Sequence, residues 1–196
     1  AYANDNYGYN RGDLPVGITE NRYIRHYYDG ALELIMLMLA YHAYTEENAF
    51  LEEYVFPLAE PVLRFYFEHY GTDDLGKLRI YPSQALETYQ DAVNPMPAVA
   101  GLQSVLEGLL ALPEASTRAE QRVQWERWVS LLPGLPTREE EGKTLLSAAE
   151  KILEQSANVE NPELYAVFPY RRYGIGKPDL DVARRTFELR RIKGNT

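Results

Sequence analysis

Two carboxylates, Glu87 and Asp91, lie in the polar stretch YPSQALETYQDAVNP at residues 81–95. Paired carboxylates can hydrolyse a glycosidic bond, because one protonates the leaving oxygen while the other activates water or attacks the sugar. The acid of such a pair needs a raised pKa, which burial among apolar side chains can provide. Leu86 and Tyr89 flank Glu87. We therefore take Glu87 as a candidate general acid and Asp91 as a candidate base.

A second interpretation of Glu87 is purely structural. A carboxylate in a turn often accepts a hydrogen bond from a nearby backbone amide, and the composition of the stretch does not exclude that role. The same stretch also carries amide and aromatic side chains that could contact sugar hydroxyls and ring faces. These candidate substrate-binding residues are Tyr81, Gln84, Tyr89 and Asn94.

A second polar and aromatic stretch, NVENPELYAVFPYRRYG, spans residues 158–174. Glu160 and Glu163 are further candidates for the catalytic base. Its mixture of amides, carboxylates and rings suits sugar binding, although a well-packed connecting loop would have a similar composition. The candidate substrate-binding residues here are Glu160, Asn161, Tyr165, Tyr170 and Arg171.

Other common chemistries lack their residues. The chain contains no Cys, which excludes disulfides, cysteine zinc sites and thiol nucleophiles. No Gly-rich phosphate loop is present, and the three His residues have no metal-ligand spacing. We expect no cofactor and no metal.

The charge of the chain narrows the class of partner. The 196 residues carry a formal net charge of −9, which would repel a nucleic acid or an acidic membrane surface and is compatible with a neutral carbohydrate. The composition, 45% hydrophobic and 25% charged, is that of a globular protein. We expect a single domain over residues 1–196, with an irregular segment at residues 1–20.

Helical periodicity dominates the elements that would position these residues. Apolar residues cover nearly all faces of residues 21–44, and residues 45–71 form a second helix that Pro57 and Pro61 should kink near residues 54–58. Residues 77–81 read as a short strand. Further helices are expected at residues 97–114, 116–136 and 179–194, whereas residues 138–155 are ambiguous between a hairpin and a helix. Long helices followed by kinked ones favour an all-α fold of helical hairpins with a short β-hairpin insertion.

Three segments resemble a known family. FLEEYVFPLAEPVLRFYFEHY (residues 50–70) resembles the kinked helix of (α/α)6-barrel glycoside hydrolases, including the inverting α-L-fucosidases of family 95. GKLRIYPSQALE (residues 76–87) resembles the segment that leads into their acid motif, Pro-Ser-x-Ser-Pro-Glu-Asn. NPELYAVFPYRRYG (residues 161–174) resembles a later active-site stretch. The combination of LETYQDAVNPMPAVAGL (residues 86–102) and VENPELYAVFPYR (residues 159–171) is closer still to a family of largely uncharacterised bacterial glycosidase-like proteins, a resemblance that covers most of residues 4–193.

The resemblance implies a role for Glu87. Pro82, Ser83 and Glu87 match the acid motif, which puts Glu87 at the position of the general acid, while Thr88 replaces the final Asn. In the later stretch Leu164, Tyr165 and Pro169 match. Asn161 and Glu163 stand where the family has His, and the family's water-activating Asn pair and supporting Asp have no clear counterpart.

The resemblance also implies an incomplete toroid. The chain covers about half of an (α/α)6 barrel, so we expect a fragment or a shortened relative. Helices such as residues 21–44 would then expose apolar faces, which favours a homo-oligomer. The family favours a periplasmic or secreted location in a bacterium.

We therefore expect a glycoside-hydrolase-like domain that binds or hydrolyses a neutral carbohydrate with inversion. Two alternatives remain open. One is a non-catalytic carbohydrate-binding or scaffold module. The other is a polysaccharide lyase, in which Arg171 and Arg172 would form a cationic clamp.

Overall fold

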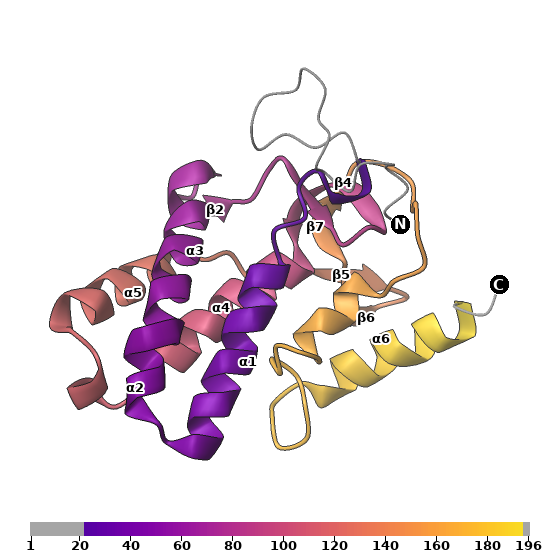
Figure 1. Ribbon diagram of the computed structural model, residues 1–196. Coiled ribbons are helices and arrows are strands. Elements are labelled where there is room, and N and C mark those ends of the chain that lie inside the picture. The colour runs from indigo at the N-terminus through magenta and orange to yellow at the C-terminus, as the bar shows by residue number, and fades with distance from the viewer. Residues whose placement is uncertain (1–21, 194–196) are drawn as a thin grey trace, which may run out of the picture.

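The computed structural model describes residues 22–193 (Figure 1). The expected irregular segment at residues 1–20 lies outside the described residues. Helical elements occupy most of the first half of this range and its C-terminal end. Their bounds are η1 Arg22–Ile24, α1 Gly30–Thr45, α2 Asn48–Phe50, η2 Leu51–Val55, α3 Phe56–His69, α4 Met96–Leu110, η3 Glu114–Ser116, α5 Ala119–Leu131, η4 Pro162–Ala166 and α6 Leu180–Lys193.

The expectation of an all-α toroid of helical hairpins is wrong. Within the described range, three small antiparallel sheets pair β1 with β2, β4 with both β3 and β7, and β5 with β6. The strands are β1 Gly71–Thr72, β2 Leu78–Arg79, β3 Ser83–Ala85, β4 Tyr89–Pro95, β5 Thr137–Glu140, β6 Lys143–Leu146 and β7 Ala149–Ile152. The chain is a mixed α and β structure.

Strands β3, β4 and β7 contain residues that locally favour a helix over a strand. Ala85, Ala92 and Ala149 are fully buried between β3, β4 and β7, although Ala is a helix former. Their small side chains let the three strands pack closely, so cross-strand pairing overrides propensity. Residues 138–155 form the β5–β6 hairpin and β7, and Glu141 and Gly142 close the hairpin with positive φ angles of 52° and 70°.

The helical run at residues 48–69 contains a widened turn. η2, at Leu51–Val55, is a π-helical turn that ends immediately before the first turn of α3. Pro57 lacks an N–H, and its ring would clash with the carbonyl of Glu53 in a regular α-turn. A wider turn relieves that clash, so the irregularity has its cause in Pro57.

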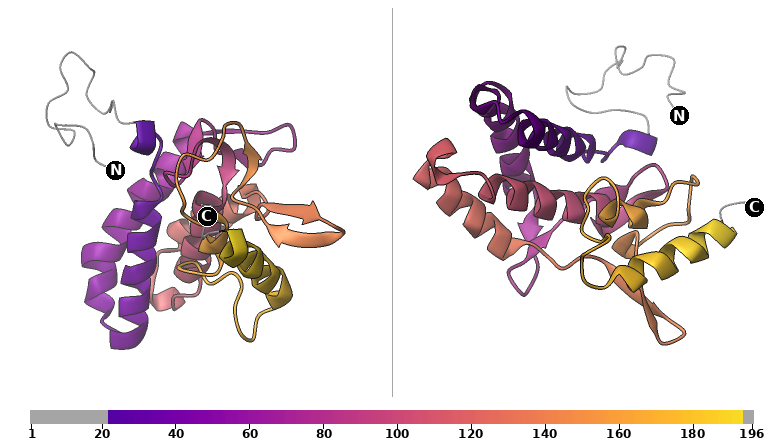
Figure 2. Two further views of the ribbon diagram at one scale, coloured as in Figure 1. Left: turned by 90° about the vertical axis from the view of Figure 1, so that its right-hand side faces the viewer. Right: turned by 90° about the horizontal axis from the view of Figure 1, so that it is seen from below.

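Helix α4 is the centre of the molecule. It packs against α1, α5 and η4, while α1 also packs against α3 (Figure 2). Gly101 allows the close approach of α1, because a Cβ there would lie 2.9 Å from Leu32 Cδ1. The tip of the β5–β6 hairpin projects outward, while α6 packs against both β6 and η4.

The starts of α1 and α4 lie close to the β3–β4–β7 sheet. η1, which precedes α1, contacts β4, and α4 follows β4 directly. The β3–β4 turn that carries Glu87 therefore lies at the end of the molecule where the sheet meets the first turn of α1. Among residues 22–193, no helix combines the length and the apolarity that crossing a membrane requires.

Candidate functional site

Glu87 lies at the tip of the β3–β4 hairpin. The three residues Leu86, Glu87 and Thr88 form the turn, and Leu86 has a positive φ of 55°. Glu87 is only 9% exposed, and its Oε2 accepts a hydrogen bond from Asn158 Nδ2 at 3.1 Å. The residue predicted as the general acid is thus nearly buried and oriented by an amide from a distant loop.

A second carboxylate, that of Glu160, holds the same turn. Its Oε2 accepts hydrogen bonds from the backbone N–H of Glu87 at 2.9 Å and from the Thr88 hydroxyl at 3.1 Å. The turn-capping role that the sequence also allowed for Glu87 therefore belongs to Glu160. As a result, two carboxylates from segments more than seventy residues apart meet at one turn.

Two further acids lie at the start of α1. Asp29 is 2% exposed, and Oδ1 accepts a hydrogen bond from the Tyr66 hydroxyl at 3.5 Å, whereas Oδ2 is buried without a partner. Burial, together with the charge of Glu33, raises the pKa of Asp29 to about 8. Burial also raises the pKa of Glu33, against the effect of a hydrogen bond with Tyr165.

Tyrosine hydroxyls hydrogen-bond the two acids at the start of α1. Tyr165 hydrogen-bonds both Glu33 and Tyr27, and burial is the main cause that raises its pKa to about 12. Burial likewise raises the pKa of Tyr27. The negative charge of Glu160 adds to the rise in pKa of both tyrosines, and Glu160 and Tyr165 line the same groove.

Sequence patterns do not single out Asp29, Glu33 or Tyr27. The available signal was a pair of carboxylates one helical turn apart in the otherwise apolar segment YYDGALELIMLMLA. A buried carboxylate costs free energy unless it is paired or protonated, so its presence in an apolar helix indicates a specific role.

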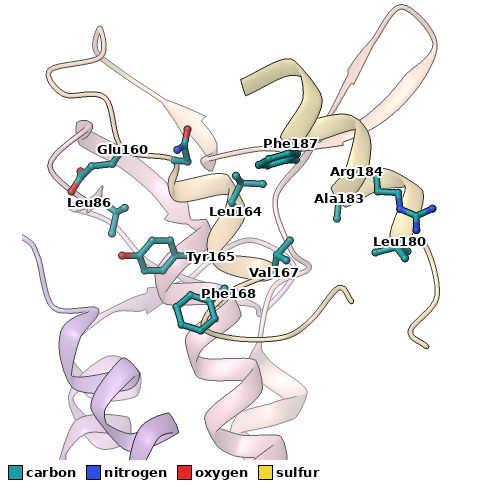
Figure 3. A pocket seen from close by; sticks show the side chains of 11 residues that line it. Leu86, Glu160, Leu164, Tyr165, Val167, Phe168, Leu180, Ala183, Arg184 and Phe187 are labelled. Carbon is teal, nitrogen blue, oxygen red and sulfur yellow. The ribbon is translucent and has the colours of Figure 1, made fainter. Parts of the chain in front are cut away.

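An apolar groove opens beside Glu160 and Tyr165 (Figure 3). Its volume is about 540 Å³, and its walls come from the η4 segment and α6. Leu86, from the hairpin tip, also lines it. The full lining is Leu86, Glu160, Asn161, Leu164, Tyr165, Val167, Phe168, Leu180, Ala183, Arg184 and Phe187.

Gln84 and Asn94, predicted as sugar contacts, bind the chain itself. The Gln84 amide is fully buried, donates to the carbonyls of Tyr23 and Leu86, and accepts from the His26 N–H. Asn94 has a positive φ of 48° and accepts a hydrogen bond from the Ile80 N–H while donating to Glu150. Both side chains hold the hairpin in place.

Glu163, predicted as a possible base, lies in an ion pair. Its Oε1 is 2.9 Å from Arg190 Nε, and its side chain is 6% exposed. Arg190 also donates to Asn161 Oδ1 and to the Glu160 carbonyl. These contacts tie the start of η4 to α6.

Strand β4 carries Tyr89 and Asp91, and Tyr81 precedes β3. All three residues are half-buried. The Asp91 carbonyl accepts the Leu153 N–H, and the Asp91 charge opposes burial and Arg25, which together lower the pKa of His26. The ring of Tyr81 lies 4.8 Å from the Arg79 guanidinium carbon.

Tyr170 is the last residue of the turn that follows η4, and Arg171 comes directly after it. Tyr170 is 2% exposed, its hydroxyl has no hydrogen-bond partner, and burial raises its pKa. Arg171 is exposed and has a positive φ of 52°. The neighbouring Arg172 pairs with Glu107 of α4, away from the hairpin tip, and it lines a different cavity.

The described residues contain no group of three His, Asp or Glu side chains that could hold a metal ion. No protein-family model matches the chain, and a search of the curated proteins finds no similar sequence.

Proposed function

We propose that this chain is a glycoside-hydrolase-like domain, with Glu87 as the general acid in an inverting hydrolysis of a neutral carbohydrate. The observation that carries the proposal is the meeting of Glu87 and Glu160 at one turn. Within residues 22–193, neither carboxylate lies in an ion pair. Both can therefore exchange a proton without first breaking an ion pair.

The surroundings of the two carboxylates suit a sugar. Tyr27, Tyr165 and Asn158 supply hydroxyl and amide groups within the same cluster. Such groups hydrogen-bond sugar hydroxyls, and tyrosine rings offer flat apolar faces. The net charge of −9 favours a neutral substrate over a phosphorylated one.

In the proposed reaction, the Glu87 carboxyl protonates the leaving glycosidic oxygen. The second carboxylate removes a proton from the attacking water, and Glu160 is our candidate for that base. After the reaction Glu87 is deprotonated and Glu160 is protonated. Proton exchange with solvent returns both carboxyl groups to their starting states. The amide of Asn158 orients the acid during this step.

The test measures hydrolysis of a panel of neutral oligosaccharides, with proton NMR to identify the anomer formed first. We expect inversion, and we expect Glu87→Gln to lower the rate by about 10²–10⁴-fold, the usual contribution of a general acid. The exposed Glu154→Gln is the matched control. Unchanged hydrolysis in Glu87→Gln would remove the acid role. Saturable sugar binding without hydrolysis in the unaltered chain would favour a non-catalytic binding module.

A further inference from the structure

The groove beside Glu160 has two apolar walls. One wall comes from η4 and the residues after it, and the other comes from α6. Phe168 and Phe187 remain 74% and 51% exposed at this groove. Large rings that stay exposed around a concave surface gain free energy when a ligand covers them. The first wall presents Leu164, Tyr165 and Phe168 to the groove, and the second presents Phe187 (Figure 3).

The two walls are held together before any ligand binds. Arg190 of α6 forms the ion pair with Glu163 at 2.9 Å and donates to Asn161 at 2.6 Å. It also donates to the Glu160 carbonyl at 2.7 Å. A site whose walls are fixed in advance loses less conformational entropy on binding, which is typical of small-molecule pockets.

One end of the groove reaches the candidate catalytic turn. Leu86 and Glu160 lie on the far side of Tyr165 from Arg184 (Figure 3). Glu160 bonds the backbone of Glu87, so a ligand that fills the groove would have one end at Glu160 and at the turn that carries Glu87. The other lining side chains between these ends are mostly apolar.

The size and charge of the groove select a ligand class. A volume of about 540 Å³ falls in the range of drug-sized ligands. Glu160 at one end disfavours an anion, whereas Arg184 at the other end is exposed and pairs with Asp181 at 3.6 Å. The rest of the lining is mostly apolar, which favours a neutral ligand. Rings of Tyr165, Phe168 and Phe187 favour a flat aromatic group.

We propose that this groove binds a planar, neutral aromatic group, as the aglycone of a glycoside whose sugar lies at Glu87. The link to a glycoside rests on the proposed function, whereas the binding of the aromatic group does not. The two ideas can therefore fail separately. The proposal assigns the substrate class of aryl glycosides to the site.

The test uses naphthol, a neutral aromatic compound, as the probe and isothermal titration calorimetry on the full chain. We expect saturable binding. Because Phe168 and Phe187 are both at least half exposed, Phe168→Ser with Phe187→Ser should spare the fold, which circular dichroism checks. That double variant should weaken binding by at least about tenfold, since two apolar ring contacts are lost.

The matched control replaces two exposed apolar residues that do not line the groove, Leu75→Ser with Val123→Ser, and should bind naphthol unchanged. Naphthol carries no glycosidic bond, so its binding is measured separately from hydrolysis. Absence of saturable binding, or equal binding by the groove variant, would overturn the proposal. So would a groove variant that changes only the oligomeric state in light scattering, because the groove would then bind a second copy.

Discussion

Asp29 is the most deeply buried acid of the site. No cation is among the groups that shift its pKa; burial and the charge of Glu33 raise it from 3.8 to about 8, while a hydrogen bond with Tyr66 opposes them. Its carboxyl is therefore protonated in the folded chain at neutral pH. A protonated carboxyl carries no charge, which suits a buried position whose Oδ1 accepts a hydrogen bond from the Tyr66 hydroxyl.

The stability of the fold should depend on this proton. In the unfolded chain Asp29 loses its proton near 3.8, while in the folded chain it keeps it up to about pH 8. Between these values the folded state binds more protons, so the free energy of unfolding falls as the pH rises. Asp29→Asn should remove this contribution. Urea unfolding at pH 5 and pH 8 should show a smaller pH dependence in the variant, with a difference of several kcal/mol, since one unit of pKa shift corresponds to about 1.4 kcal/mol.

Exposed Asp74→Asn is the control for this experiment and should keep the pH dependence of the unaltered chain. Identical pH dependence in Asp29→Asn and the unaltered chain would contradict the assignment of a protonated Asp29.

Individual site residues were predictable only in part. The position of Glu87 in a polar turn was visible in the sequence, and it remains the proposed acid. Most partners of Gln84 and Asn94 were not, because the fold brings Tyr23 to Gln84 and brings Ile80 and Glu150 to Asn94. The same is true of Glu163, whose partner Arg190 lies on α6.

At the scale of elements, the contact of α1 with α4 sets the position of the acids. Asp29 immediately precedes α1, and Gly101 lies where α4 meets both Leu32 and Tyr170. A Cβ on Gly101 would lie 2.9 Å from the Leu32 side chain and 2.9 Å from the Tyr170 hydroxyl. The packing here leaves no room for a methyl group.

Gly101→Ala should destabilise the fold by about 1–3 kcal/mol through overpacking, measured by urea unfolding. Gly108→Ala in the same helix is the matched control, because its Cβ would closely approach only the flexible end of Leu39. There, the gain of about 1 kcal/mol in helix propensity should offset the contact. Equal stability of the two variants would show that α1 and α4 are not closely packed at Gly101.

Helices were more predictable than strands. The segments at residues 97–114, 116–136 and 179–194 carry clear helical periodicity; α5 and α6 lie within the last two, and α4 begins one residue before the first. The β3–β4–β7 sheet depends on pairing between Ala92 and Ile152, sixty residues apart, and on buried Ala residues that locally favour helix. Short-range patterns carry little of that information, and the all-α expectation failed for this reason.

At the scale of the whole molecule, α1 carries an exposed apolar stripe. Leu34, Leu37, Tyr41 and Tyr44 recur at helical spacing and are all at least 45% exposed. An apolar patch of this kind favours association. We propose that the chain forms a homo-oligomer through this stripe, which we call the α1 stripe.

Light scattering at high concentration should show a dimer or larger oligomer. Leu34→Gln with Leu37→Gln should shift the population to the monomer, since both changes place amides on the α1 stripe. The Leu75→Ser and Val123→Ser double variant serves again as the control. A monodisperse monomer of the unaltered chain would count against the proposal.

We propose that Glu87 donates a proton to the leaving oxygen. Varying the leaving group tests this role most directly. A dinitrophenyl leaving group needs little protonation, whereas an unsubstituted phenyl group needs it fully. Hydrolysis rates of matched dinitrophenyl and phenyl glycosides should be compared in the unaltered chain and in Glu87→Gln. We expect Glu87→Gln to lower the hydrolysis rate of the phenyl glycoside by about 10²–10⁴-fold and that of the dinitrophenyl glycoside by much less. An equal loss for both substrates, or no loss for either, would contradict the proposed role of Glu87.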